Sequence, residues 1–327
     1  MILQPLPGVG DMVWHLPAIH RLAALHPDRE KVLLTKQRSR ADELFAADPA
    51  IDRVIWVDRA EKHAGPGGFR ALINDLRQEG FARSYQLHHS SRYAGAIAGA
   101  GIPERFAYGT TAVTRWLSQP PHLGTAMRRD HPIDLANQFI ELLDAPPVDH
   151  ADQLRVSPEL ANQVQQNFAG FPKPWIAIGV GSSEAFKQWG AERFASFVAA
   201  LAAKQPATFF LLGGPGEAAF QLVIEAALTG SGASRLVAGF EWPISHIIAA
   251  QAAMDAYVGN DTAFLNISAA VGVQAFGLFG ATEPLRYSPL IEAIMPEDGP
   301  ISCEDGMARI HPAKLADQLS ERLFNHR

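Results

Sequence analysis

The stretch Tyr257-Val-Gly-Asn-Asp-Thr-Ala-Phe-Leu-Asn-Ile-Ser-Ala-Ala-Val-Gly-Val-Gln-Ala-Phe-Gly-Leu-Phe-Gly-Ala-Thr282 is the most informative part of this 327-residue chain. Its pattern predicts the end of a strand, a polar turn at Gly259–Thr262, a short helix and a second strand. A helix that starts directly after a strand leaves backbone N–H groups unpaired, and these groups attract phosphate. The stretch therefore indicates an α/β fold that holds a nucleotide-type ligand.

The same alternation of strand and helix runs through the whole chain. The expected strands are 1–3, 31–35, 53–57, 84–88, 175–180, 207–212, 235–238, 256–258 and 274–279. The expected helices are 12–25, 40–47, 68–79, 92–100, 191–204, 217–228, 244–253, 263–271 and 312–324. Connections of this length predict two doubly wound parallel sheets, each covered by helices. Polar, Pro-rich segments at 144–153 and 170–174 separate the halves.

Composition narrows the class of protein. The length fits two domains. The sequence contains no run of 18 apolar residues, so no membrane span is predicted. The lone Cys303 excludes an internal disulfide framework, and the first residues lack the pattern of a signal peptide, so we expect a cytoplasmic protein. Residues 1–150 carry 17 basic and 17 acidic side chains, while 151–327 carry 11 and 17. This balance argues against a nucleic-acid partner.

In the first half, Gly8-Val-Gly-Asp11 follows the first strand and opens a helix. Glycine allows a tight turn, and Gly10 brings backbone close to a ligand. The carboxylate of Asp11 at a helix start stays ionised and can accept a proton from a substrate hydroxyl. The same residues also fit a plain turn with a capping Asp.

Cationic and polar side chains follow two further strands on the same side of the predicted sheet: Lys36, Arg38, His88, Ser90 and Arg92. They fit a pocket for an anionic acceptor, and equally a solvated loop. The histidines have no metal-type spacing with Cys or carboxylate partners, so no metal site is predicted.

In the second half, the turn after the strand 175–180 contains Ser182, Ser183 and Lys187. Hydroxyls and an ammonium suit phosphate oxygens, although a polar loop with a solvated Lys explains them as well. After the next strand, Gly213-Gly-Pro-Gly is followed by Glu217, whose carboxylate could take two ribose hydroxyls or simply cap the turn.

Taken together, these motifs resemble glycosyltransferase family 9, the family of the lipopolysaccharide heptosyltransferases. The resemblance covers nearly the whole chain, in order. It rests on Gly10-Asp11 with His15-Leu-Pro-Ala-Ile19, Ala47-Ala-Asp-Pro-Ala-Ile-Asp-Arg-Val-Ile55, Ser90-Ser-Arg92, Lys187-Gln-Trp189, Gly213-Gly-Pro-Gly-Glu217, Gly259-Asn-Asp-Thr262 and Phe279-Gly-Ala-Thr-Glu-Pro284.

The resemblance implies a GT-B fold: two Rossmann-like doubly wound domains that face each other across a cleft. Residues 1–150 would bind the acceptor, residues 151–310 a nucleotide sugar, and the C-terminal helix in 311–327 would pack back toward the first domain. Asp11 would be the base, and Gly10, Lys36, Arg38, His88, Ser90 and Arg92 would line the acceptor site. The expected donor residues are Ser182, Ser183 and Lys187 for the diphosphate, Glu217 for ribose, and Asp261, Thr262, Ala263 and Asn266 at the helix start.

Three positions depart from the family pattern. Ala263 stands where a Gly is usual, Asn266 where a His is usual, and Pro5 near the place of an Arg. Asn donates a hydrogen bond but cannot carry the charge of a protonated His. These three departures bear on which donor sugar the protein uses and, to a lesser degree, on whether it is active.

The resemblance implies an inverting, metal-independent transferase without a cofactor, whose substrate is an ADP-linked sugar such as ADP-heptose. Its acceptor would be a lipopolysaccharide core or a related glycan or glycolipid, reached by peripheral contact at the cytoplasmic face of the inner membrane. Two alternatives stay open. The chain could transfer another nucleotide sugar to capsule, O-antigen or protein, or it could be a catalytically silent paralogue that binds nucleotide sugars.

Overall fold

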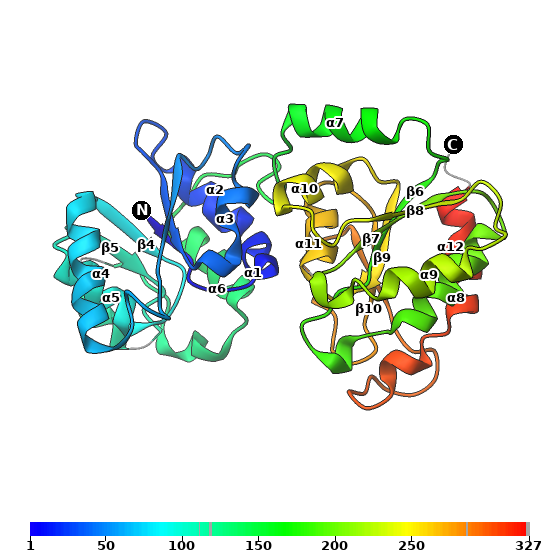
Figure 1. Ribbon diagram of the computed structural model, residues 1–327. Coiled ribbons are helices and arrows are strands. Elements are labelled where there is room, and N and C mark those ends of the chain that lie inside the picture. Colours follow the sequence, from blue (N-terminus) through cyan, green and yellow to red (C-terminus); the bar gives the residue numbers. More distant parts are fainter. Residues whose placement is uncertain (111, 118–119, 286, 325–327) are drawn as a thin grey trace. The chain divides into compact units, whose positions relative to one another are not determined.

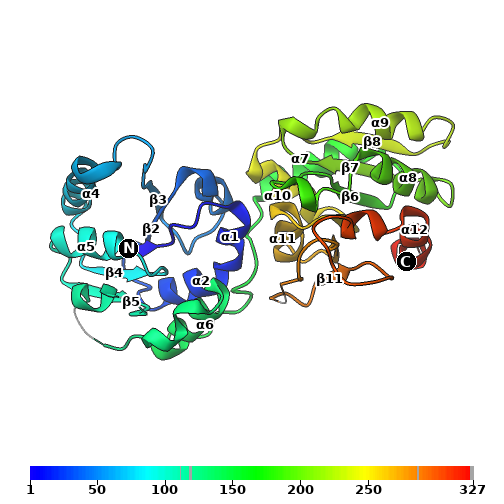
Figure 2. The same cartoon turned by 90° about the horizontal axis from the view of Figure 1, so that it is seen from below.

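The computed structural model describes residues 1–110, 112–117, 120–285 and 287–324, and it contains two compact units (Figures 1 and 2). The first unit is Met1–Gln153 and the second is Leu154–Arg327. The division lies at the end of the polar segment 144–153, close to the predicted boundary at residue 150. The segment 170–174 lies inside the second unit, because a helix precedes it there.

The first unit is built on a five-stranded parallel sheet in the order β3-β2-β1-β4-β5. Its strands are β1 (Ile2–Leu3), β2 (Val32–Thr35), β3 (Arg53–Trp56), β4 (Arg83–Gln86) and β5 (Glu104–Ala107). The chain winds outward from β1 to β3 and then returns to the other side of β1. The carboxyl ends of β1 and β4 therefore form the topological switch point, where doubly wound sheets bind ligands.

Helices and short 3₁₀ turns cover this sheet, and α4 and α5 pack together (Figure 1). The helices are α1 (Val9–Trp14), α2 (Leu16–Ala24), α3 (Ala41–Leu44), α4 (Gly65–Glu79), α5 (Ser91–Gly99) and α6 (Pro132–Leu142), with 3₁₀ turns η1 (Gln37–Ser39), η2 (Ala112–Trp116) and η3 (Thr125–Arg129). The expected single helix 12–25 is wrong. Pro17 has no N–H to donate to Val13 and crowds its carbonyl, so the helix is interrupted at His15.

The second unit contains a six-stranded parallel sheet in the order β11-β10-β9-β6-β7-β8. Its strands are β6 (Trp175–Gly179), β7 (Thr208–Leu212), β8 (Arg235–Ala238), β9 (Ala256–Asn260), β10 (Ala275–Leu278) and β11 (Ile291–Ile294). Here the switch point lies at the carboxyl ends of β6 and β9. The polar turn predicted at Gly259 starts later, because Gly259 and Asn260 still pair within the sheet.

Helices cover both faces of this second sheet (Figure 2). They are α7 (Pro158–Phe168), α8 (Ala191–Ala202), α9 (Phe220–Ala227), α10 (Ile244–Ala252), α11 (Ala263–Ala270) and α12 (Pro312–Phe324), with 3₁₀ turns η4 (Ala185–Lys187), η5 (Pro215–Glu217) and η6 (Gly306–Arg309). Ile176 and Ile178 of β6 face one core with α8 and α12, while Trp175 and Ala177 face the other. Side chains alternate along a strand, so a strand buried on both faces reads as a continuous apolar run.

The last helix buries the apolar stripe Leu315, Leu319 and Leu323 in the core that it shares with α8. It stabilises the second unit through this stripe. Its predicted return toward the first domain stays a prediction.

A buried contact between His20 and Asp48 joins distant segments of the first unit. His20 Nε2 lies 2.7 Å from Asp48 Oδ2, and His20 Nδ1 lies 2.6 Å from the carbonyl oxygen of Ala151. Both side chains are almost fully buried. Each ring nitrogen of His20 thus lies at hydrogen-bond distance from an oxygen acceptor. It ties α2 to the segment before β3 and to the end of the first unit.

We predict that Asp48→Ala lowers the free energy of unfolding by about 2–4 kcal/mol, because it removes the acceptor for the buried His20 ring and for the N–H of Ala50. Chemical denaturation of the variant and the wild type measures the difference. Lys62→Ala, which removes an exposed ion pair with Asp75, is the matched control and should change stability by less than about 1 kcal/mol. Equal effects of the two substitutions would contradict a structural role for the buried pair.

Candidate functional site

Asp11 lies at the switch point of the first unit, in the short helix that follows β1. Its Oδ2 accepts a hydrogen bond from the backbone N–H of Gly8 at 2.9 Å. The carboxylate is half-buried. The second unit repeats this contact: Oε2 of Glu217 accepts a hydrogen bond from the N–H of Gly214 at 2.9 Å. Both Gly-x-Gly-acid turns therefore hold an anchored carboxylate beside the carboxyl end of a strand.

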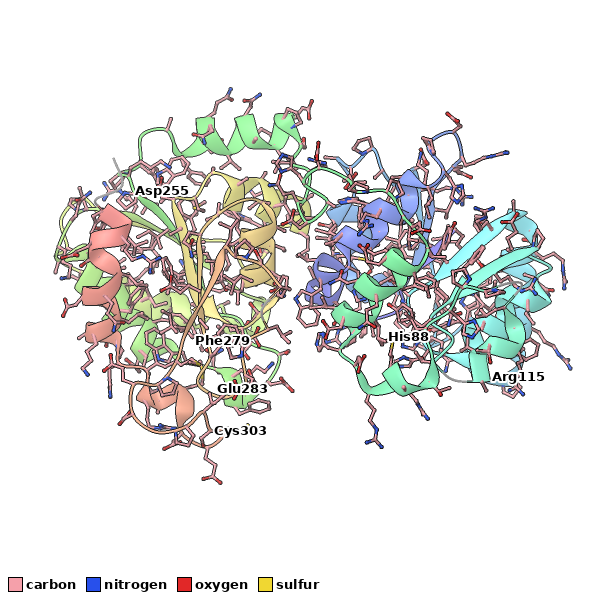
Figure 3. The ribbon with its side chains drawn as sticks, turned by 180° about the vertical axis from the view of Figure 1, so that it is seen from behind. His88, Arg115, Asp255, Phe279, Glu283 and Cys303 are labelled. Carbon is pink, nitrogen blue, oxygen red and sulfur yellow. The ribbon has the colours of Figure 1, made fainter. Side chains whose placement is uncertain are left out.

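Lys36 and His15 lie near enough to His88 to act electrostatically on its ring. Burial, reinforced by His89, Lys36 and His15, lowers the pKa of His88 to about 4. His88 is therefore neutral at neutral pH. The N–H of Ser90 donates to His88 Nδ1 at 3.0 Å, which holds the ring against the start of α5. His88 belongs to the segment after β4 (Figure 3).

The remaining predicted acceptor residues differ in what they contact. Arg92 donates from Nη2 to the carbonyl oxygens of His63, at 2.8 Å, and Gly65, at 2.9 Å, so it fastens the start of α4. Arg38 is exposed in η1, and Gly10 is half-buried inside α1. These contacts give Arg92 a structural task, while its acceptor role stays a prediction.

In the second unit, two glycines let β6 and β9 approach closely at their carboxyl ends. A Cβ on Gly259 would lie 2.5 Å from the carbonyl oxygen of Gly179, and a Cβ on Gly179 would lie 1.8 Å from the hydroxyl of Tyr257. Neither position has space for a larger side chain. The loop after β6 is thereby held beside the loop after β9.

Asn260 then joins these two loops. Its fully buried amide nitrogen lies 3.2 Å from the carbonyl oxygen of Val180, 3.1 Å from that of Gly181 and 2.9 Å from Oε1 of Gln188. Its oxygen accepts from the N–H of Trp189 at 3.3 Å. A satisfied buried amide rigidifies the backbone that it touches. Asn260 thus determines the course of the loop that carries Ser182 and Lys187.

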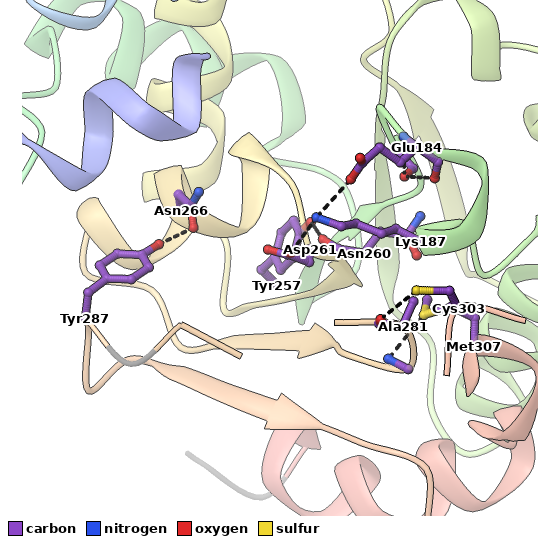
Figure 4. Close-up of polar contacts among 12 residues, drawn as sticks. Glu184, Lys187, Tyr257, Asn260, Asp261, Asn266, Ala281, Tyr287, Cys303 and Met307 are labelled. Carbon is purple, nitrogen blue, oxygen red and sulfur yellow. Dashed lines mark hydrogen bonds and ion pairs between the residues drawn. The ribbon is translucent and has the colours of Figure 1, made fainter. Parts of the chain in front are cut away.

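Lys187 lies between two carboxylates (Figure 4). Its Nζ is 3.3 Å from Asp261 Oδ2 and 3.2 Å from Glu184 Oε2. Burial lowers the pKa of Lys187, but Asp261 and Glu184 outweigh this effect and hold the pKa above its usual value. The ammonium is therefore charged and positioned beside the start of α11.

Thr262 precedes α11 in an extended conformation, and its side chain makes no capping bond to the helix among the described residues. By helix geometry, the N–H groups of Ala263, Phe264 and Leu265 have no partner within α11. Asn266 is buried one turn later and accepts a hydrogen bond from the hydroxyl of Tyr287 (Figure 4). This helix start offers uncapped donors beside a fixed cation.

The hydroxyls of the loop after β6 have different environments. Ser182 Oγ donates to the carbonyl oxygen of Glu184 at 2.8 Å, so it shapes the loop, whereas Ser183 is exposed. Among the described residues, no group of three His, Cys, Asp or Glu side chains is arranged to hold a metal ion. None of the helices in the described ranges has the length and apolar character needed to cross a bilayer.

Three residues of this arrangement were not predicted as site residues from the sequence: Asn260, Gln188 and His15. All three residues stood inside quoted motifs, and the available signal for Asn260 was an amide at the end of an apolar strand. His15 Nδ1 lies 2.7 Å from the carbonyl oxygen of Asp11. Its signal was a His directly before the Leu-Pro pair that ends α1.

Comparison with known proteins gives a consistent result. A family model described as glycosyltransferase family 9 (heptosyltransferase) matches residues 67–303. Escherichia coli ADP-heptose LPS heptosyltransferase II superposes with a TM-score of 0.76 at 21% identity, over 99% of this chain and 98% of that chain. A family 9 glycosyltransferase of Veillonella parvula gives 0.76 at 17% identity, over 100% and 97%.

Escherichia coli heptosyltransferase WaaC with ADP-2-deoxy-2-fluoro heptose gives a TM-score of 0.70 at 13% identity, over 98% of each chain. A search of curated protein sequences finds no significant match. The structural likenesses, together with the two doubly wound sheets, confirm the predicted GT-B fold class.

We predict that His88 makes stability depend on pH between about 4 and 6.5. The unfolded chain takes up a proton on His88 below pH 6.5, whereas the folded chain does so only near pH 4, so stability falls as the pH falls through this window. The loss should be on the order of 2 kcal/mol. Unfolding at pH 7 and pH 4.5 measures it in wild type and in His88→Asn, whose amide oxygen still accepts from Ser90. An identical pH dependence in both proteins would contradict the assignment.

Proposed function

The chain belongs to glycosyltransferase family 9, and we propose that it is an inverting transferase that moves heptose from ADP-heptose to a lipopolysaccharide-core or related glycan acceptor. The observation that carries this proposal is the charged Lys187 beside the uncapped start of α11, at the switch point of the second sheet. Such an arrangement suits the diphosphate of a nucleotide sugar. Two similar solved structures are an ADP-heptose LPS heptosyltransferase and a heptosyltransferase with ADP-2-deoxy-2-fluoro heptose.

On the acceptor side, Asp11 is the proposed base. As an acceptor hydroxyl oxygen forms its bond to the anomeric carbon, its proton passes to Oδ1 of Asp11. Oδ2 meanwhile stays bonded to the N–H of Gly8, which keeps the carboxylate in place. Attack from the side opposite to the leaving group inverts the anomeric configuration. A carboxylate is a weak base, so it accepts the proton late, when the oxygen has become acidic.

On the donor side, the bond from the anomeric carbon to the diphosphate oxygen breaks, and the nucleoside diphosphate leaves with the electron pair. Negative charge grows on that oxygen. Lys187 and the N–H groups at Ala263 and Phe264 are the proposed stabilising donors, with Ser182 and Ser183 on the loop opposite. Preorganised donors of this kind each contribute about a hundredfold to a thousandfold in rate. In this scheme Glu217 binds the ribose, and neither a metal ion nor a cofactor takes part.

A second candidate is the transfer of a different nucleotide sugar to capsule, O-antigen or protein. Ala263 and Asn266 favour it, because Asn266 is neutral and already accepts a hydrogen bond from Tyr287. The third candidate is a catalytically silent paralogue that binds nucleotide sugars. Asp11 argues against it, because a protein that only binds needs no base at that position. With a glycolipid acceptor, we propose that the protein works at the cytoplasmic face of the inner membrane.

We predict that the wild type transfers sugar from ADP-heptose and that Asp11→Asn loses about 10²–10⁴-fold in kcat. The amide retains an acceptor for the N–H of Gly8, so the turn should keep its conformation. ADP affinity should be unchanged, because the proposed ADP site lies in the second unit. The measurement is acceptor-dependent release of nucleoside diphosphate from a panel of ADP-, UDP- and GDP-sugars, with calorimetry for ADP. Asp42→Asn, an exposed carboxylate on α3, is the control. Robust turnover by Asp11→Asn, or preference for a UDP- or GDP-sugar, would overturn the corresponding part of the proposal.

We predict that Lys187→Ala weakens ADP binding by about 1.5–3 kcal/mol, or roughly tenfold to a hundredfold in Kd, because a charged donor to the diphosphate is lost. Titration calorimetry measures the affinity. Glu184→Gln removes one carboxylate that competes with phosphate for the same ammonium, so its Kd should be unchanged or lower. An unchanged Kd in Lys187→Ala, accompanied by a lower Tm, would show that Lys187 only joins the two loops.

A further inference from the structure

The carbonyl oxygen of Asp11 has lost its ordinary helical partner. In a continuous helix it would accept from the N–H of His15 four residues on. Because the helix ends at Trp14, this N–H donates instead to Met12 at 3.1 Å. The Asp11 carbonyl is left with two side chains, His15 Nδ1 at 2.7 Å and Gln4 Nε2 at 3.2 Å.

These contacts determine the tautomer of His15. A carbonyl oxygen only accepts, so a 2.7 Å contact requires the proton on Nδ1. Gln4 Nε2 also lies 3.2 Å from His15 Nδ1, but both are then donors, and Gln4 is held by the Asp11 carbonyl. Gln4 is fully buried at the exit of β1, and its oxygen accepts from the N–H of Leu6 at 3.1 Å. The Asp11 main chain is thus fastened to the first strand of the sheet.

His15 itself is fully buried, and its Nε2 has no hydrogen-bond partner among the described residues. An apolar side chain would avoid this unpaired nitrogen, so packing alone does not account for the ring. Burial lowers the pKa of His15, against smaller opposing effects of its bond to Asp11 and of the Asp11 charge. The ring is therefore a neutral donor at neutral pH.

From this geometry we propose that His15 is a positioning residue: its Nδ1–H and the Gln4 amide clamp the Asp11 main chain so that the Asp11 carboxylate is held at the acceptor hydroxyl. The inference rests on the proposed function of Asp11 as the base. The role proposed for His15 differs from that of Asp11, because His15 acts on the Asp11 main chain and touches neither substrate. Misplacing a base by about 1 Å can cost on the order of a hundredfold in rate without changing substrate affinity.

Three substitutions separate the two ring nitrogens. The amide nitrogen of His15→Asn lies where Nδ1 lies, that of His15→Gln reaches the place of Nε2, and His15→Phe keeps the shape without a donor. We expect His15→Asn to stay within about fivefold of the wild-type kcat, and His15→Gln and His15→Phe to lose about 30- to 100-fold. The KM of donor and acceptor should change less than about twofold in all three.

The control is His26→Asn, a histidine that contacts Tyr85 at the amino-terminal edge of the same sheet, which should leave kcat unchanged. The ¹⁵N resonances of His15 in the wild type report the tautomer without any turnover, and protonation at Nδ1 is expected. Retained kcat in His15→Gln with loss in His15→Asn would place the action at Nε2 and overturn the proposal. Equal kcat values in all three variants, or a proton on Nε2, would overturn it too.

The outcomes for the two proposals can be told apart. A wild type that transfers no sugar from any donor refutes the proposed function, and with it the positioning role. An active wild type with insensitive His15 variants refutes the positioning role alone. If His15→Phe does not fold, the comparison of His15→Asn with His15→Gln still tests whether the Nδ1–H positions Asp11.

Discussion

The buried amide of Asn260 is the contact on which the candidate donor site depends. It contacts the backbone at Val180 and Gly181 and the side chain of Gln188, and it accepts from Trp189. The contact is possible because Gly179 and Gly259 let β6 and β9 approach until no Cβ would fit. Lys187 then meets Asp261 across the two loops. An apolar residue at position 260 would remove the partner that Asn260 offers to the N–H of Trp189 and to the carbonyl oxygen of Gly181, and unpaired buried polar groups are costly at low dielectric.

The two units share one arrangement of sheet and turn but are proposed to serve different chemical steps. Each has a parallel sheet that winds outward from a central strand, and each has a Gly-x-Gly-acid turn whose carboxylate accepts from a glycine N–H. In the first unit the surrounding groups include the neutral histidines His15 and His88, and the proposed task is to accept one proton. In the second unit a lysine held by carboxylates faces a helix start, and the proposed task is to stabilise a departing diphosphate.

Several features were predictable from local sequence. The alternation of elements, the parallel sheets and the glycine-acid turns follow from periodicities and turn chemistry that act within a few residues. Other features were missed for physical reasons. Pro17 interrupts a helix whose amphipathic pattern continues past it, and Gly259 and Asn260 pair as strand although both residues favour turns. At Gly259 and Asn260, local propensity was overridden by pairing with neighbouring strands, whereas at Pro17 the local loss of an N–H donor outweighed the amphipathic pattern.

By itself, the sequence determined the fold class, the membership of a family and the short list of polar side chains at strand ends, because apolar runs and turn residues carry that information locally. Only the tertiary structure decided which of these side chains meet. Lys187 and Asp261 are 74 residues apart, and Asn260 and Val180 are 80 residues apart. Arg92 donates to the carbonyl oxygen of His63, 29 residues before it in the chain. Such contacts depend on the order in which strands enter the sheet, and no local pattern encodes that order.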